Sequence, residues 1–114
     1  MSVSFGPTPR APAADPARAT SSTATTTTVV AAVPGKRIRV YFVHLAADGN
    51  VYVYVQFSSR TAAANRLVPT YLAVRTAYNA NKIASVWEGP AGDSLQMVTD
   101  AAVNVECQVD FEYV

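Results

Sequence analysis

His44 and Cys107 are the side chains best suited to nucleophilic or metal chemistry, and each is the only residue of its type. A Ser/His/Asp or Cys/His catalytic set would have to use His44, and no G-x-S-x-G motif accompanies it. One histidine and one cysteine also supply too few good ligands for a transition-metal site. Since His44 lies within a hydrophobic segment, a structural imidazole is expected there. We therefore expect a non-enzymatic protein with no catalytic residue, no metal ion and no cofactor.

Acidic side chains offer two weaker routes to chemistry. Asp48 and Asp93 fall in expected turns, where Ca²⁺ could bind oxygen ligands, but no EF-hand-like spacing supports such a site. Three further acids share one side of the last alternating segment: Glu106, Asp110 and Glu112. A solvated strand face is the expected interpretation of these three, in preference to a glycosidase pair.

Aromatic side chains are the remaining candidates for binding. They are Tyr41, Tyr52, Tyr54, Tyr71, Tyr78 and Trp87. These residues could line a sugar-binding surface or cover a subunit interface, where tyrosine and tryptophan are enriched. Several could instead complete the core of a small domain. The sequence spacing does not rank the first two alternatives.

Charge is distributed unevenly along the chain. The formal net charge of +1 gives no case for nucleic-acid binding. Residues 29–82 carry seven basic side chains and one acid, whereas residues 83–114 carry six acids and no base. Opposite charges could pair inside one sheet, or they could face each other on neighbouring subunits and set their orientation.

Four residues are candidates for a subunit interface. Tyr52 and Tyr54 alternate on one side of an expected strand, and Arg37 and Arg39 do so on another. Aromatic and arginine side chains are the types most enriched at protein interfaces.

Two segments alternate clearly between apolar and polar residues, which is the pattern of half-buried strands. In residues 51–57, valines occupy alternate positions up to a final phenylalanine. In residues 103–113 the apolar positions include Cys107, so a buried, unreactive thiol is expected. A single cysteine also permits no internal disulfide, which fits assembly in a reducing cytosol.

A third alternating segment spans residues 36–46. Ile38, Val40 and Phe42 occupy one side, and the other side begins basic and ends apolar. The Asp-Gly pair within residues 47–50 is a strong hairpin signal.

The rest of the chain suggests more short strands. They are expected at residues 29–33 (or from Thr25), 67–79, 83–87 and 94–98, separated by turns at 34–35, 79–82, 88–93 and 100–102 and by a polar loop at 58–66. The 67–79 segment reads as one or two strands bent near Pro69, and a short helical turn could form at residues 62–64. This gives about seven or eight strands and an all-β fold, an antiparallel β-sandwich of jelly-roll-like or immunoglobulin-like type.

The first quarter of the chain has a different composition. Residues 1–28 hold four of the seven prolines and a threonine-rich tract, with almost no large apolar side chains. Such a segment cannot offset its ordering entropy internally, so we expect an extended arm that orders only against another surface. The domains expected are therefore an arm at 1–28 and a sandwich at 29–114. Candidate docking residues in the arm are Val3, Phe5, Pro7, Pro9 and Arg10.

Targeting and membrane signals are not expected to play a part. The N-terminus shows neither a basic n-region nor an apolar h-region, and no run of 18 apolar residues occurs. We therefore expect no membrane partner.

The chain from Ala32 onward contains four pieces in a characteristic order. They are a GKRIRV-type strand (residues 36–40), a later tryptophan (Trp87), a small-residue turn of the A-G-[DE]-x-L type (residues 91–95) and an alternating strand that ends in tyrosine (residues 103–113). With these pieces the chain resembles small β proteins of tailed bacteriophages and prophages. The proline-rich and threonine-rich arm and the Tyr-Val-Tyr strand depart from this pattern.

Proteins of this kind are usually structural components of the virion. The resemblance implies a head decoration (cement) protein or a small tail or fibre module. We expect a capsid decoration protein that binds the major capsid protein on the outer capsid surface and is assembled in the host cytoplasm. A homo-oligomer is expected, with a trimer favoured. The resemblance implies no catalytic residue. The alternative is a tail, baseplate or head-fibre module that binds a host surface glycan through its tyrosines.

Overall fold

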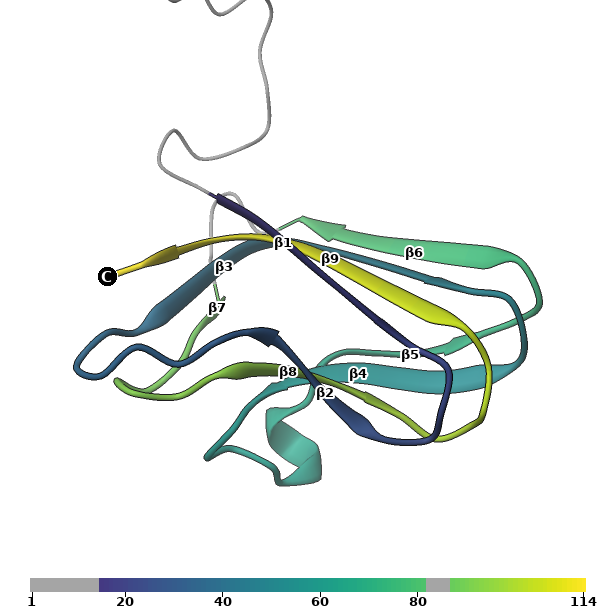
Figure 1. The fold of residues 1–114 in the computed structure, drawn as a ribbon, viewed down its shortest axis with the longest axis horizontal. Helices are drawn as coiled ribbons and strands as arrows, with labels where there is room; N and C mark the ends of the chain where they lie inside the picture. The colour runs from purple at the N-terminus through teal and green to yellow at the C-terminus, as the bar shows by residue number, and fades with distance from the viewer. Residues whose placement is uncertain (1–14, 82–86) are drawn as a thin grey trace, which may run out of the picture.

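A computed structural model describes residues 15–81 and 87–114, which form two antiparallel β-sheets packed face to face (Figure 1). Sheet A has the strand order β1-β9-β3-β6, with β7 also paired to β3, and sheet B has the order β2-β8-β4-β5. Sheet A comprises β1 (Asp15–Ser21), β3 (Ile38–Ala47), β6 (Thr76–Asn81), β7 (Trp87–Glu88) and β9 (Val105–Tyr113). Sheet B comprises β2 (Thr26–Val30), β4 (Val51–Phe57), β5 (Leu67–Leu72) and β8 (Leu95–Thr99). The predicted all-β sandwich is confirmed.

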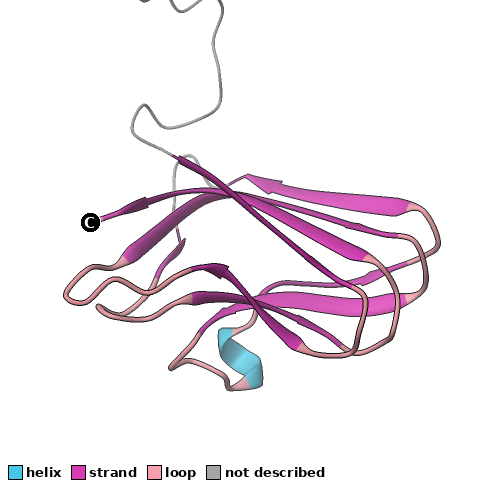
Figure 2. Cartoon of the chain, viewed as in Figure 1, coloured by secondary structure: helices cyan, strands magenta, loops and turns pink. Residues whose placement is uncertain are grey.

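Regular structure in the described residues is almost entirely strand (Figure 2). A single 3₁₀ turn, η1 (Ala63–Asn65), lies in the loop between β4 and β5, next to the position expected for a helical turn. Among the residues that the structure describes, no helix is long and apolar enough to cross a lipid bilayer.

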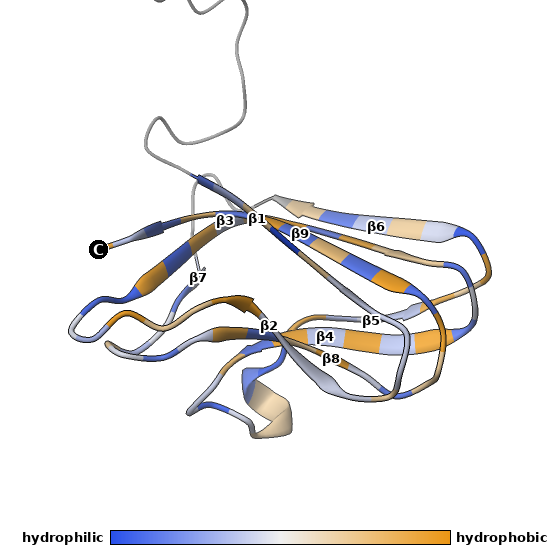
Figure 3. Cartoon of the chain, viewed as in Figure 1, coloured by the Kyte–Doolittle hydropathy of each residue, from blue (hydrophilic) through white to orange (hydrophobic). Residues whose placement is uncertain are grey.

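The core lies between the two sheets and follows the alternation of the sequence. Figure 3 shows the resulting bands of hydrophobic and hydrophilic residues along β4 and β9. In β9, Val105, Cys107, Val109 and Phe111 are buried, as are the alternate residues of β4 from Val51 to Phe57. Leu95 and Met97 of β8 are fully buried as well. The inward faces predicted for these three strands are confirmed.

The turn after β3 joins the two sheets and does not close a hairpin. β3 belongs to sheet A and β4 to sheet B, so the hairpin prediction for residues 47–50 was wrong. The Asp48 amide donates a hydrogen bond to the Asn104 carbonyl (3.0 Å), which lies in the connection from β8 to β9. A Cβ at Gly49 would lie 2.6 Å from Val103 Cγ1, so glycine permits the two connections to pack together. A tight Asp-Gly turn is as well suited to this corner as to a hairpin.

A β-bulge in β3 changes which of its side chains face the core. The register with β9 shifts between Val40 and Phe42, so the inward set is Ile38 and Val40 and then Val43 and Leu45. Phe42 is only half-buried, and its predicted place beside Val40 was wrong. An extra residue on one strand reverses the alternation beyond it. The bulge also explains why one side of the segment begins basic and ends apolar.

Part of the predicted N-terminal arm belongs to the sandwich. Residues 15–21 form β1, which pairs with β9 from Asp15 opposite Phe111 to Ser21 opposite Val105. β2 pairs with β8, and the Thr99 amide donates to the Thr25 carbonyl (3.0 Å). For residues 15–28 the prediction was therefore wrong. Residues 1–14, with the candidate docking residues Val3, Phe5, Pro7, Pro9 and Arg10, lie outside the described residues.

Large apolar side chains are not needed to hold residues 15–28 in the sandwich. Ala17 and Ala19 of β1 pack against the core, and β1 satisfies its backbone groups on the edge of β9. Val29 and Val30, at the end of β2, are buried. Backbone hydrogen bonds to an existing sheet thus provide the stabilisation that residues 15–28 could not obtain by burying their own side chains.

The segment from 67 to 81 forms two strands in different sheets. Pro69 lies in β5, at an edge of sheet B, which is where a strand tolerates proline. Residues 79–81 belong to β6, so the turn expected there was wrong for those residues. The strand expected at 83–87 falls largely outside the described residues, and β7 begins at Trp87.

Candidate binding surfaces

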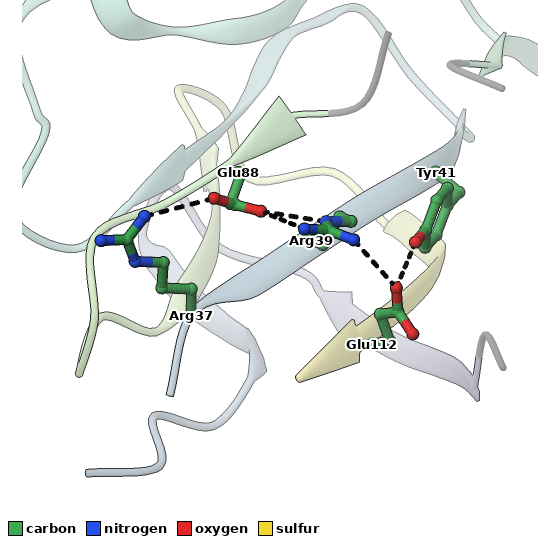
Figure 4. A network of polar contacts seen from close by, with 5 residues as sticks. All are labelled: Arg37, Arg39, Tyr41, Glu88 and Glu112. Carbon is green, nitrogen blue, oxygen red and sulfur yellow. Dashed lines mark hydrogen bonds and ion pairs between the residues drawn. The ribbon is translucent and has the colours of Figure 1, made fainter. Parts of the chain in front are cut away.

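Arg39 is the centre of a charged network on the outer face of sheet A (Figure 4). Its Nη2 lies 2.9 Å from Glu88 Oε1, and its Nη1 lies 3.4 Å from Glu112 Oε1. Arg37 Nη1 lies 3.4 Å from the other oxygen of Glu88, and the Tyr41 hydroxyl donates a hydrogen bond to Glu112. The network joins β3 to its neighbours β7 and β9.

These contacts favour the ionised form of Glu88 and the neutral, protonated form of Tyr41. Hydrogen bonds from Arg39, and then from Arg37, lower the pKa of the Glu88 carboxyl. Hydrogen bonding to Glu112 raises the pKa of Tyr41, which keeps its hydroxyl protonated as a donor. Together with the contact between Arg18 and Glu106 (2.6 Å), the network pairs basic and acidic strands inside one sheet. Pairing of opposite charges inside one sheet is the first of the two alternatives given for the uneven charge distribution.

The four segments on which the sequence resemblance rests meet around this network. Val40 lies opposite Trp87 in β7, at the start of β3. The Gly92 amide of the small-residue turn donates to the Lys36 carbonyl (2.8 Å). Arg37 and Val114 exchange backbone hydrogen bonds of 3.0 and 2.9 Å, which ties the end of the chain to the start of β3. Segments that are separated in sequence therefore form one structural unit.

The outer face of sheet B carries a second surface, made of aromatic side chains. The ring centroids of Tyr52 and Tyr71 lie 4.5 Å apart, and those of Tyr52 and Tyr54 lie 5.7 Å apart. The Arg66 guanidinium lies 4.3 Å from the Tyr54 ring centroid and donates to the Tyr52 hydroxyl (3.4 Å). Tyr71 is 82% exposed, so one ring of the group is presented to solvent.

A hollow of about 470 Å³ lies beside this aromatic group. Tyr52 and Tyr71 line it together with Asn50 and Asp100. Asp100 Oδ1 accepts a hydrogen bond from the Tyr52 amide (2.8 Å), which fixes the carboxylate at the rim. Aromatic rings next to amide and carboxylate groups can contact both the apolar and the hydroxyl-bearing parts of a ligand.

A larger hollow, of about 660 Å³, lies where β1, β3, β6 and β9 end or begin. Polar groups along it include Thr20, Asp48, Arg75, Asn104 and Glu106. Glu106 is already paired with Arg18, and Asn104 donates a hydrogen bond to Asp48 (3.4 Å).

The chain's two candidate reactive groups occupy separate places. His44 Nδ1 contacts the Asn79 side-chain oxygen on the outer face of sheet A. Cys107 is fully buried, and this burial raises the pKa of its thiol to about 12, so the predicted burial of the thiol is confirmed. Within 15–81 and 87–114, no group of three or more His, Cys, Asp or Glu side chains is placed to hold a metal ion.

The four interface candidates do not form one surface. Arg37 and Arg39 lie with the outer face of sheet A, whereas Tyr52 and Tyr54 lie on the outer face of sheet B. Tyr71 had been recognised only as one of several aromatics, and Arg66 had not been considered. Arg66 lies in an irregular loop, where no sequence period indicates the direction of a side chain.

The fold defines an all-β sandwich with one charged and one aromatic outer face. No protein-family model matches the chain, and no curated protein matches it significantly.

Proposed function

We propose that this chain is a non-enzymatic structural protein of a phage particle, a capsid decoration protein that binds the major capsid protein on the outer surface. The observation that carries the proposal is the meeting of the four phage-like segments in one unit around Arg39. Its charged groups contact one another within the chain and so serve to hold β3, β7 and β9 together. Such a unit provides a rigid scaffold for docking and contributes no reactive group.

The proposed anchor is residues 1–14, which precede β1 at the edge of sheet A. Val3, Phe5 and the prolines Pro7 and Pro9 would dock against the capsid protein, and Arg10 would add a charged contact. Many such weak contacts, repeated across a symmetric lattice, give high avidity.

Co-sedimentation with purified capsids tests this role. The full chain and a variant that lacks residues 1–14 would each be mixed with capsids from which the protein has been stripped. The full chain should pellet with the capsids, and the shortened chain should bind much more weakly while keeping the same circular-dichroism spectrum. A full chain that stays in the supernatant would contradict the proposal.

A second candidate function, binding of a host surface glycan, draws on the exposed ring of Tyr71 beside the hollow that Asn50 and Asp100 line. A pyranose could stack on Tyr71 and donate hydroxyl hydrogen bonds to Asp100. Binding to a glycan array by the wild type, lost in Tyr71→Ala and kept in Tyr113→Ala on the other sheet, would favour this candidate. Absence of any glycan signal for the wild type would remove it.

A further inference from the structure

β6 is an edge strand that is exposed on both of its faces. It pairs with β3 on one side, and no other described strand pairs with its second side. Thr76, Ala77, Tyr78 and Asn79 are all exposed. Its outer backbone groups are therefore available to another strand.

The other edge strands each carry a feature that discourages pairing, and β7, which also pairs with β3, is only two residues long. β1 contains Pro16 and the charged Arg18, and β2 is five residues long with a register shift between Thr28 and Val30. β5 contains Pro69 and the left-handed Val68 (φ 50°), opposite a register shift in β4. Proline, charge, short length and bulges are the devices by which proteins protect sheet edges.

β6 has none of these devices. Its register with β3 runs without interruption from Thr76 opposite Ala47 to Asn81 opposite Phe42. The strand has the sequence TAYNAN, with neither charge nor proline. Among the edges that the structure describes, this is the one built as a regular template.

Tyr78 marks the middle of this edge. It lies opposite Leu45, whose side chain faces the core, so Tyr78 projects on the inner side of sheet A. It is nevertheless 46% exposed, and Val74, in the connection that leads to β6, is 56% exposed. Apolar surface is thus gathered next to unpaired backbone groups.

We propose that a second copy of this chain pairs with β6, antiparallel about a two-fold axis at Tyr78, so that sheet A continues from one copy into the other. Residues opposite each other in an antiparallel pair project on the same face of the sheet. A two-fold axis normal to the sheet must therefore pair odd-numbered residues with odd-numbered ones and even-numbered residues with even-numbered ones. An axis at Tyr78 meets this condition and places the two Tyr78 rings opposite each other. Cross-strand aromatic pairs of this kind are favourable.

The rest of the register is also compatible with a second copy. Ala77 would lie opposite the partner's Asn79, and Thr76 opposite the partner's Ala80. Arg75 precedes β6 and has a left-handed backbone (φ 56°), so the regular pairing begins at Thr76 and includes no charged residue. The edge of β6 is therefore complementary to itself. Two-fold pairing would give the outer backbone groups of β6 partners in both copies through a single contact.

This contact goes beyond the proposed capsid role and differs from the trimer expected in the sequence analysis. A closed three-fold ring needs β6 to pair with a different edge, and the other edges are interrupted or charged. The dimer does not depend on capsid binding, so failure of either proposal leaves the other intact.

Sedimentation velocity of the full chain tests the dimer, over a concentration range of about a hundredfold, because association follows mass action. The expected result is a monomer–dimer equilibrium. Tyr78→Lys should abolish it by placing two lysines opposite each other, whereas Tyr71→Lys, on the edge of sheet B, should leave it unchanged. A wild type that stays monomeric or forms trimers would overturn the proposal, as would a dimer that persists in Tyr78→Lys.

A charge-swap experiment protects this test against simple misfolding of the variant. Tyr78→Lys and Tyr78→Glu should each be monomeric, and an equimolar mixture should form a heterodimer because the opposed charges are then complementary. Restored dimer in the mixture would show that both variants are folded and that position 78 lies at the axis. A mixture that stays monomeric would contradict an axis at Tyr78.

Discussion

Ala17 of β1 lies directly opposite Val109 of β9, within a seven-residue antiparallel pair. A small side chain is sufficient at this position because β1 contributes mainly by pairing its backbone with β9. The sandwich therefore begins within the segment whose composition suggested an arm. Within the described residues, the sandwich begins with β1 at Asp15.

Two truncations test where in the chain the sandwich begins. Deleting residues 1–14 should leave the free energy of unfolding nearly unchanged, because the described sandwich keeps all its strands. Deleting residues 1–28 removes β1 and most of β2, and should lower that free energy on the order of 3 kcal/mol or more, a large share of a small domain's stability. Urea unfolding monitored by circular dichroism measures both. Equal stability of the two truncated chains would contradict the assignment of β1 and β2 to the sandwich.

Placing a charge on the inner face of β9 should prevent folding. Val109 is fully buried, so Val109→Asp buries an unpaired carboxylate and should cost about 4 kcal/mol or more. Gln108→Asp introduces the same group one position away, on the exposed face, and should cost less than about 1 kcal/mol. Thermal unfolding of the two variants checks the pair. A cooperative, native-like transition for Val109→Asp would show that the faces of β9 are assigned wrongly.

The stability contributed by Glu88 should depend on pH. Its folded-state pKa lies below the ordinary value of 4.5, chiefly because Arg39 donates hydrogen bonds to it. A lowered folded-state pKa stabilises the fold above the unfolded pKa, and this contribution is lost as pH falls through the folded pKa. The difference in free energy of unfolding between wild type and Glu88→Gln should therefore shrink below pH 4.5.

Urea unfolding from about pH 7 to about pH 3 measures this difference. In an Arg39→Gln background, where the main donor is gone, the effect of Glu88→Gln should vary much less with pH. Added salt should also reduce it, since the side chains of Arg39 and Glu88 are 36% and 30% exposed. A difference that stays constant with pH in the wild-type background would show that Arg39 does not favour ionised Glu88.

Cys107 should be protected from thiol reagents while the protein is folded. Its side chain is fully buried and its pKa is raised to about 12, so little thiolate is exposed. Labelling with Ellman's reagent at about pH 8 should be slow in buffer and fast in urea, with the rate following global unfolding. Rapid labelling of a chain that keeps its circular-dichroism spectrum would contradict the placement of β9 in the core.

Strands with an uninterrupted alternation could be predicted from the sequence. In β4 and β9 one side of the segment is apolar throughout, so the period of two identifies both the strand and its buried face. The charge pairing within sheet A was anticipated as one of two alternatives, because basic and acidic residues were concentrated in different strands.

Features that depend on tertiary pairing could not be predicted in this way. Phe42 was assigned to the wrong side because a single extra residue in β3 reverses the alternation, and nothing in the local composition signals it. The corner at Gly49 was taken for a hairpin because the same residues suit both kinds of turn. β1 was missed because its alanines carry almost no hydrophobic signal.

The candidate surfaces were only partly accessible to sequence reasoning. Tyr52 and Tyr54 could be placed together because they alternate in one strand. Their grouping with Tyr71 and Arg66 depends on the pairing of β4 with β5 and on an irregular loop. For the same reason, the separation of Arg39 from the tyrosines on opposite faces appears only once the strands are assigned to sheets.

The copy number and position of the protein in purified phage particles test the proposed role most directly. Quantitative mass spectrometry of the purified particles, combined with electron microscopy, measures the copy number and the position. A capsid decoration protein should be present on the order of hundreds of copies per particle, over the outer capsid surface, because it follows the repeating lattice. Its absence from the particles, or a few copies confined to the tail, would contradict the account.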